Sequence, residues 1–150
     1  MAQVEHIQRV MTELGPVDDA IGLIDQLGDD QWLVVYDDDT AVEIECDETG
    51  NKLVFSMSLG PVSDQRKKLL HEVMLTWNYL YHDTGGMRLA VEGAEGNVVL
   101  LVDLCHLDID VGTLAGFLEA FVETGRGWRE VLQQDAPADE GERPAGAIVV

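Results

Sequence analysis

Hydrophobic residues recur at three- and four-residue steps over residues 63–82, the spacing that gathers side chains onto one face of an α-helix. The apolar positions of this face are Leu69, Leu70, Val73, Met74, Trp77, Leu80 and Tyr81. Ser63 is a candidate N-cap, and Gly85 and Gly86 tolerate the left-handed conformation in which many helices end. Burial of the face is worth on the order of 10 kcal/mol. The helix is therefore expected to lie on the strands predicted on both sides of it.

Two stretches before this helix alternate between apolar and polar residues, as half-solvated antiparallel strands do. The apolar positions are Val42, Ile44 and Cys46 in residues 40–46, and Leu53, Phe55, Met57 and Leu59 in residues 52–59. Residues 32–36 are a run of large and β-branched side chains, which predicts a buried strand and completes a three-stranded meander. After the helix, residues 87–92 and 98–107 predict a hairpin.

Two more helices are predicted at the ends of this series. Residues 4–14 carry an apolar stripe that Gly15 and Pro16 are expected to end, and residues 114–133 keep the helical period after the candidate N-cap Asp110. Gly125 and Gly127 mark a kink or a close helix contact. Residues 17–30 fit a short helical turn or an irregular strand equally well. The predicted fold is α+β, in the order helix, three strands, helix, two strands, helix, with an antiparallel twisted sheet packed on the helices.

A chain of 150 residues that is 46% hydrophobic is long enough for one domain with its own core. We assign this domain to residues 1–134. Residues 135–150 are rich in Asp, Ala, Pro, Glu and Gly, which bury too little apolar surface to offset the entropy of ordering. An acidic, flexible tail is expected there.

The chain is strongly acidic, with 29 Asp and Glu residues against nine Lys and Arg and a formal net charge of -20. Such a surface repels phosphate backbones and anionic lipids, which argues against nucleic-acid and membrane partners, and it favours solubility or a basic or aggregation-prone partner. Cys46 and Cys105 have no metal or redox spacing and are expected to be small core residues in a reducing cytoplasm. No segment has the apolar length of a signal peptide or a membrane span, so a cytoplasmic protein is expected.

Candidate catalytic chemistry is sparse. His71 and His82 are eleven residues apart and could share a helix face, but no third ligand completes a zinc site. Asp37, Asp39 and Glu48 match the first, third and twelfth positions of a calcium loop. However, Ala41 and Val42 stand where an oxygen ligand and a glycine are required. No nucleophile arrangement, phosphate-binding loop or dinucleotide motif occurs. We therefore expect no enzyme activity, no metal and no cofactor.

The apolar surface suggests a protein partner instead. Trp77, Tyr79 and Tyr81 are spread around the helix at 63–82, which makes that helix broader in apolar character than one sheet contact requires. Either these aromatic residues pack under the strands, or a second copy of the chain covers them. Exposed apolar patches on a soluble acidic protein usually mark a partner site.

At this point the order of elements and the residues on them resemble the CesT/SycE-type class I chaperones of type III secretion systems, the Tir chaperone family. The resemblance covers residues 4–132 and is strongest over LLHEVMLTWNYLYHDTGGMRLAVEGAEGNVVLLVDL and LAGFLEAFVETGRGWREVL. In that family a leucine-rich helix runs through an asparagine to a glycine-rich stop, and an aromatic residue and a late tryptophan mark the last helix. The matching positions are Leu69, Leu70, Asn78, Gly85, Gly86, Phe121 and Trp128. The segment 17–30 is longer than usual for the family.

The resemblance implies a bacterial cytoplasmic homodimer, a virulence-associated chaperone paired largely through the central helix and neighbouring strands. It would bind the N-terminal chaperone-binding region of a secreted effector in extended form and keep it soluble and secretion-competent. Alternate apolar side chains of the effector would enter grooves beside the first helix and the meander, with main-chain hydrogen bonds at a strand edge. The expected effector contacts are Ile7, Val10, Met11, Leu14, Val34, Ile44 and Phe55, and the expected dimer contacts are Val73, Trp77 and Tyr81.

One alternative within the same family stays open. Some members are regulatory proteins that bind an anti-activator or another small partner and so couple secretion to transcription. The secretion ATPase is a further partner that the sequence leaves open. The identity of the bound partner would separate these roles.

Overall fold

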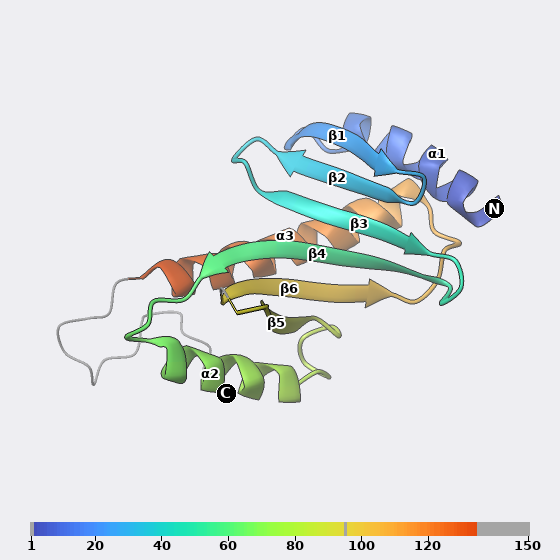
Figure 1. The fold of residues 1–150 in the computed structure, drawn as a ribbon. Helices are drawn as coiled ribbons and strands as arrows, with labels where there is room; N and C mark the ends of the chain where they lie inside the picture. Colours follow the sequence, from blue (N-terminus) through green and yellow to red (C-terminus); the bar gives the residue numbers. More distant parts are fainter. Residues whose placement is uncertain (1, 95, 135–150) are drawn as a thin grey trace. The chain divides into compact units, whose positions relative to one another are not determined.

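The computed structural model describes residues 2–94 and 96–134 (Figure 1). Helix α1 spans Ala2–Val17, α2 spans Lys67–Tyr79 and α3 spans Val111–Gln133. The strands are β1 Ile21–Gly28, β2 Gln31–Tyr36, β3 Ala41–Asp47, β4 Lys52–Pro61, β5 Arg88–Glu92 and β6 Asn97–Leu104. They form a six-stranded sheet in the order β1-β2-β3-β4-β6-β5. The predicted α+β class is confirmed, with four strands rather than three before α2.

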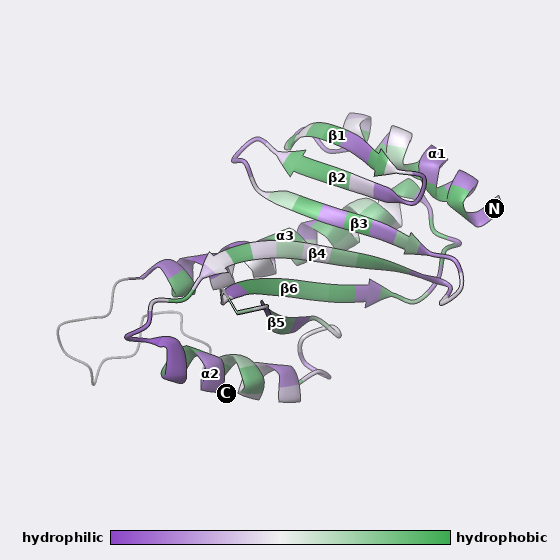
Figure 2. Cartoon of the chain, in the orientation of Figure 1, coloured by the Kyte–Doolittle hydropathy of each residue, from purple (hydrophilic) through white to green (hydrophobic). Residues whose placement is uncertain are grey.

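The alternating stretches form strands with one buried face, as predicted. In β3, Val42, Ile44 and Cys46 are buried while Glu43 and Glu45 are exposed. The buried residues of β4 are the four predicted for one face: Leu53, Phe55, Met57 and Leu59. Because successive side chains of a strand point to opposite faces, alternating apolar residues build a core on one side of the sheet. The longer apolar run of β6 is hydrophobic along most of its length (Figure 2).

Strand β1 occupies the segment for which the sequence allowed either a helical turn or a strand. It pairs antiparallel with β2, and because Gly28 pairs with Gln31, a two-residue turn joins the strands. The register shifts near both ends of β1. Each such β-bulge adds an unpaired residue and breaks the period of two. The apolar residues of β1 therefore do not alternate along the sequence as those of β3 and β4 do.

Three predicted helix limits are wrong: the end of α1 and both ends of α2. Helix α1 does not end at Gly15 but continues through Pro16 to Val17. A proline in the last turn removes one hydrogen bond that a terminal turn can lose at low cost. Helix α2 is not capped by Ser63: it begins at Lys67, after the N-cap Arg66, and has no side-chain cap hydrogen bond.

Arg66 at this N-cap bonds instead to the end of α3. Its guanidinium is buried and donates to the carbonyl oxygens of Val131 at 3.0 Å and Gln134 at 2.7 Å. The last carbonyls of a helix have no partner within the helix, so this cation satisfies groups that would otherwise be open. At its other end α2 stops at Tyr79, before Gly85 and Gly86. Both glycines have positive φ, in the loop that leads to β5.

The start and end of α3 agree with the sequence. The backbone N–H of Thr113 donates to Asp110 Oδ1 at 2.7 Å, the predicted cap, and the helix ends at Gln133. A Cβ at Gly127 would meet no atom within 4 Å, so no close contact requires a glycine there. Before α3, β6 stops at Leu104 rather than residue 107. Cys105 consequently lies outside the sheet and is exposed, against the expectation of a core residue, whereas Cys46 is buried.

The chain divides into two compact units. Unit 1 comprises Met1–Met57 and Val102–Glu123, and unit 2 comprises Ser58–Leu101 and Thr124–Val150. In unit 1, α1 and the first part of α3 lie on the same face of β1–β3 (Figure 1). In this core the ring centroid of Phe55 lies 5.0 Å from that of Phe117 and 6.0 Å from that of Phe121.

The core of unit 2 contains the aromatic pair that the sequence placed on two different helices. The rings of Trp77 on α2 and Trp128 on α3 meet edge to face with centroids 5.4 Å apart. The predicted tail at 135–150 lies outside the described residues, and the assignment of 1–134 to one domain stays a prediction.

Candidate binding groove beside an open strand edge

Strand β1 is the last strand on its side of the sheet and pairs with β2 alone. Six of its eight residues are exposed. An end strand presents backbone N–H and C=O groups on its outer side that no strand satisfies, which makes it a template for an incoming extended chain. Among the described strands of unit 1, β1 is the one with this open edge.

A groove of about 610 Å³ runs between α1 and β1. Its lining residues come from one side of α1, from β1 and from β2: Gln8, Met11, Thr12, Gly15, Ile21, Gly22, Leu23, Ile24, Gln26 and Trp32. The α1 residues share a side because they are three and four positions apart. At Gly15 the helix comes close to the strand, since a Cβ there would lie 3.9 Å from Ile24 Cδ1. The groove is thus part of the packing between α1 and the sheet.

Each end of the groove lies beside an acidic turn. At one end the side-chain amide of Gln8 donates to the carbonyl oxygen of Asp29, at 3.4 Å, in the turn between β1 and β2. At the other end the backbone N–H of Asp37 donates to the carbonyl oxygen of Ala20 at 2.9 Å. The carboxylate of Asp37 approaches Gly22 so closely that a Cβ there would lie 3.0 Å from Oδ1.

The exposed large hydrophobic residues described in unit 1 gather on the elements that form this groove. Val17 at the end of α1 is 56% exposed, and Leu23 and Leu27 on β1 are 55% and 50% exposed. Figure 2 shows β1 hydrophobic toward both ends, with the hydrophilic Asp25 and Gln26 between them. Uncovered apolar side chains of this size beside an open backbone edge are typical of a protein-binding surface.

The seven residues expected to contact an effector lie elsewhere. They are at most 3% exposed and belong to the core of unit 1: Ile7, Val10, Met11, Leu14, Val34, Ile44 and Phe55. Their apolar periodicity places them on the faces of α1, β2, β3 and β4 that pack together, which leaves little of them for a partner to touch. Met11 is the one among them that also lines the groove.

The groove residues on β1 were missed by the sequence reasoning. Ile21, Leu23, Ile24 and Leu27 were noted as apolar, but two bulges hide the strand period that would have identified an edge strand. A signal was available in the turn: the acidic pair Asp29 and Asp30 separates two apolar stretches of similar length, as in a two-residue hairpin.

Unit 2 carries a second uncovered apolar surface on α2. Leu75 and Tyr79 project from the side of the helix opposite its buried residues and are 68% and 81% exposed, while Leu69 on the flank of the helix is 49% exposed. Of the expected dimer contacts, Val73 is half-buried, Tyr81 is exposed beyond the helix end, and Trp77 is buried against Trp128.

The described side chains form no metal-binding cluster. No group of three or more His, Cys, Asp or Glu residues in residues 2–94 and 96–134 is placed to hold a metal ion. His6 uses Nε2 to contact the carbonyl oxygen of Ile109 at 2.7 Å. Burial, together with the neighbouring carboxylates, raises the pKa of the Cys46 thiol to about 11, which opposes nucleophilic use. None of the described helices is long and apolar enough to cross a membrane.

The fold and the groove therefore define a small α+β protein whose distinguishing feature is an uncovered sheet edge rather than a reactive site. The chain belongs to the Tir chaperone protein (CesT) family, whose sequence model matches residues 23–129. The predicted resemblance is confirmed. Comparison with curated protein sequences gives no match.

Two solved structures share the fold. A chain of the HopA1–SchA chaperone–effector complex is 18% identical to this chain in sequence, with a TM-score of 0.63. The match covers 87% of this chain and 98% of the chain in the complex. A chain of the ExsC–ExsE complex is 11% identical to this chain, with a TM-score of 0.67. The match covers 86% of this chain and 95% of the chain in that complex. At these identities the likeness concerns the fold.

Proposed function

We propose that this chain is a type III secretion chaperone that binds the N-terminal chaperone-binding region of a secreted effector in extended form. It acts in the bacterial cytoplasm, holds the segment soluble and secretion-competent, and catalyses no reaction. The observation that carries the proposal is the open edge of β1 beside an apolar groove, in a chain of the Tir chaperone family.

Binding occurs by addition of a strand to β1. At about 3.3 Å per residue, the eight residues of β1 offer an edge roughly 26 Å long. The added segment takes main-chain hydrogen bonds from the edge, and every second side chain points toward α1 and enters the groove. There it meets Met11, Ile24 and Trp32, the apolar lining of the groove floor.

The buried residues first expected to contact the effector have an indirect role in this proposal. Ile7, Val10 and Leu14 hold α1 against the sheet and so set the width of the groove. Val34, Ile44 and Phe55 form the opposing core surface. Met11 alone of the seven belongs to both the core and the contact surface.

The first experiment identifies the partner. A tagged copy is isolated under mild conditions from its native bacterium, and proteins that co-purify in stoichiometric amount are identified by mass spectrometry. A secreted protein that remains bound when reduced to its N-terminal region supports the proposal. A small cytoplasmic regulator in its place would support the alternative role in transcriptional coupling.

The second experiment locates the contact. The double variant Leu23→Asp, Leu27→Asp places charge on two exposed side chains, so the fold is retained while partner affinity falls roughly 100-fold, the loss expected from two apolar anchors. The matched control is Val91→Asp, an exposed strand residue of unit 2 that is 41% exposed. Equal affinity of the double variant and the parent chain would contradict binding at β1.

We further propose that the chain is a homodimer joined through the uncovered side of α2. Tyr79→Asp is expected to convert the dimer to a folded monomer, with a mass near the 16.5 kDa of one chain by light scattering. Trp77→Asp is a poorer test of pairing, because Trp77 is buried against Trp128 and its loss destabilises unit 2 itself. If the double variant Tyr79→Asp, Leu75→Asp keeps the mass of a dimer, this interface is refuted.

A further inference from the structure

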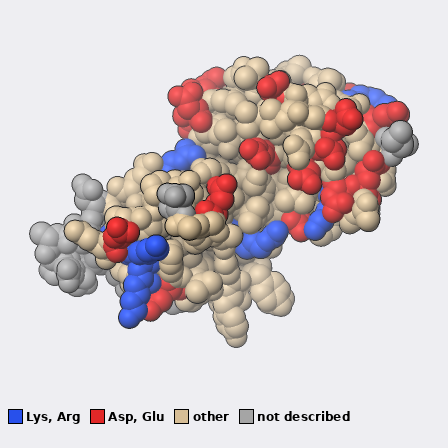
Figure 3. Space-filling view, viewed as in Figure 1, with Lys and Arg blue, Asp and Glu red and all other residues tan. Residues whose placement is uncertain are grey.

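The negative charge of the chain is concentrated in unit 1. The segments Met1–Met57 and Val102–Glu123 contain 19 acidic and two basic residues, a formal charge of -17. Unit 2 contains ten acidic and seven basic residues, a formal charge of -3. Figure 3 shows acidic side chains spread over the visible face of unit 1. Solubility alone gives no reason for this asymmetry, since charge anywhere on the surface would serve it.

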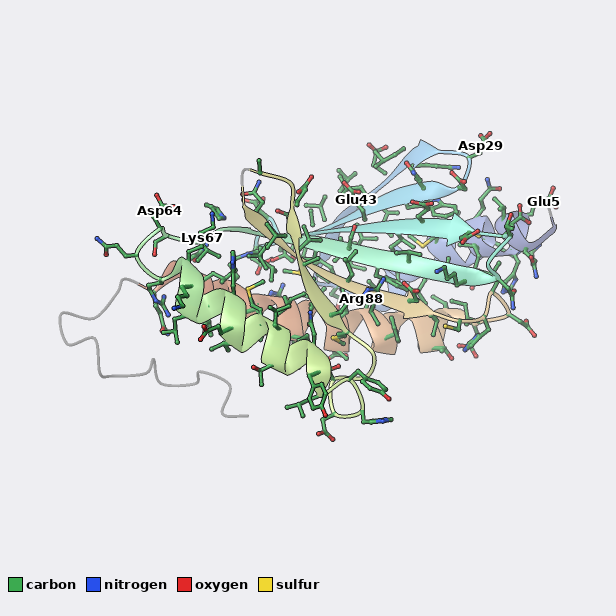
Figure 4. The ribbon with its side chains drawn as sticks, turned by 60° about the horizontal axis from the view of Figure 1, so that its bottom comes forward. Glu5, Asp29, Glu43, Asp64, Lys67 and Arg88 are labelled. Carbon is green, nitrogen blue, oxygen red and sulfur yellow. The ribbon has the colours of Figure 1, made fainter. Side chains whose placement is uncertain are left out.

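Two acidic residues of unit 1 lie at the ends of the groove. Asp29 lies at the turn beside Gln8 and Asp37 lies beside Gly22, so both ends of the groove are acidic. Figure 4 shows Asp29 and Glu5, at the start of α1, near the same end of unit 1. One of the two basic residues, Lys52, is already paired with Asp103 at 3.1 Å.

The strand register places Asp25 and Ile24 on opposite faces of β1, with Leu23 on the face of Asp25. Ile24 pairs with the buried Val34, and this row faces the core and the groove. Asp25 pairs with Leu33, which in turn pairs with the exposed Glu43, so this row lies on the opposite, outer face. A strand added beyond β1 continues both rows: one set of its side chains enters the apolar groove, and the other set lies next to Leu23 and Asp25.

We infer that the segment bound at β1 is an extended chain in which apolar residues alternate with Lys or Arg. This inference rests on the proposed function and names the chemistry of the partner. Cross-strand pairs of opposite charge stabilise a sheet. A segment with Asp or Glu at the alternate positions would instead be repelled by the carboxylates on the outer face and at both turns. The field of unit 1 also raises the rate of association of a basic segment at low salt.

The test uses three synthetic twelve-residue peptides with identical apolar residues at alternate positions and Lys, Gln or Glu at the others. Binding to the full chain is followed by fluorescence polarisation at 100 mM NaCl. The Lys peptide is expected to bind about tenfold more tightly than the Gln peptide, and the Glu peptide at least tenfold more weakly than the Gln peptide, since several surface ion pairs contribute a small factor each. Raising NaCl to 500 mM should remove most of the difference.

Two triple variants locate the effect. Asp25→Asn, Asp29→Asn, Asp37→Asn removes three carboxylates around β1 and is expected to reduce the preference for Lys over Gln to less than threefold, with the Gln peptide unaffected. The control Asp108→Asn, Glu119→Gln, Glu123→Gln removes the same charge from exposed positions before and on α3. The control is expected to keep the full preference.

The outcomes separate this inference from the proposed function. Equal binding of the Lys and Gln peptides would overturn the basic pattern and leave the groove as a peptide site. An equal loss in the two triple variants would also overturn it, because the effect would then come from net charge and not from the β1 edge. Binding of none of the peptides would refute both the inference and the proposed strand addition.

Discussion

The side chain of Asn78 joins α2 to β5 in the manner of a backbone pair. Its Nδ2 donates to the carbonyl oxygen of Leu89 at 2.8 Å, and the N–H of Leu89 donates to its Oδ1 at 2.8 Å. Strand β5 is the other end strand of the sheet and pairs with β6 alone. The amide of Asn78 thus satisfies both main-chain groups of Leu89 on the side where no strand follows.

Asn78→Ala removes both hydrogen bonds and leaves the N–H and C=O of Leu89 without their partner. Each bond is worth about 1 kcal/mol net, and an unsatisfied buried group costs a further 1–3 kcal/mol. Leu89 is 5% exposed, so water reaches these groups poorly. We expect a loss of about 2–4 kcal/mol in the free energy of unfolding, measured by urea denaturation followed by circular dichroism.

Asn78→Asp gives a sharper test because its effect depends on pH. The carboxylate accepts from the Leu89 N–H but opposes the Leu89 carbonyl, whereas the protonated carboxyl can donate to it and restore both bonds. The folded state therefore raises the pKa of the introduced carboxyl above its unfolded value of about 3.9. The protein binds more protons when folded, so the deficit relative to the parent is smallest at low pH and grows as pH rises through the folded-state pKa.

The measurement compares unfolding free energies from pH 5.0 to 7.5, above the isoelectric point near 4.1. Asn51→Asp is the control, since it adds the same charge at an exposed position whose side chain accepts one bond, from Gln3 at 3.4 Å. If Asn78→Asp has the parent's free energy of unfolding at pH 7.5, or if the difference between them does not change with pH, the role assigned to Asn78 Nδ2 as a donor to Leu89 is refuted.

Three further predictions concern single features. The bond from Thr113 N–H lowers the pKa of Asp110, so the stabilisation from this cap is present above the unfolded-state pKa and is lost as pH falls through the folded-state pKa. At pH 7, Asp110→Ala should lower the melting temperature and Asp110→Asn should largely keep it. Equal melting temperatures of the parent and both variants would exclude the cap. Gly127→Ala should raise the unfolding free energy by about 0.5–1 kcal/mol, since the new methyl meets no neighbour and glycine is a poor helix former; a loss in urea denaturation would show a contact at this position. A thiol reagent at pH 8 should modify exposed Cys105 at least about 100-fold faster than Cys46, whose pKa burial raises to about 11; similar rates by mass spectrometry would show that the Cys46 site opens.

The sequence predicted the core faces because burial and periodicity have the same cause. Val42, Ile44 and Cys46 alternate since one side of β3 faces the helices, and the register of β3 with β4 sets Phe55 beside Ile44. The α2 face was recognised in the same way, and its buried residues include Met74 and Trp77. Where one face of an element meets the core, its pattern can be read without a structure.

The helix limits failed for a different reason. Helix α2 begins after Arg66 rather than at Ser63, and the guanidinium of Arg66 bonds to carbonyls more than 60 residues away in the chain. Pro16 was expected to stop α1, yet a terminal turn tolerates it. Local propensity carries no information about such long-range bonds, so the boundary residues were the least predictable part of the fold.

The residues predicted to contact an effector are buried because periodicity marks what a fold covers, whereas a binding surface must be left uncovered. The strongest stripe of α1 builds the core, whereas β1, with its two bulges, retains exposed Leu23 and Leu27. The bulges also limit where a partner can pair. Between them, Leu23 to Gln26 keeps an unbroken ladder with β2, from Val35 to Trp32, and the outer edge of a regular ladder is regular too. In the proposed strand addition, the best hydrogen-bonding register is therefore along these four residues, of which Ile24 and Gln26 face the groove.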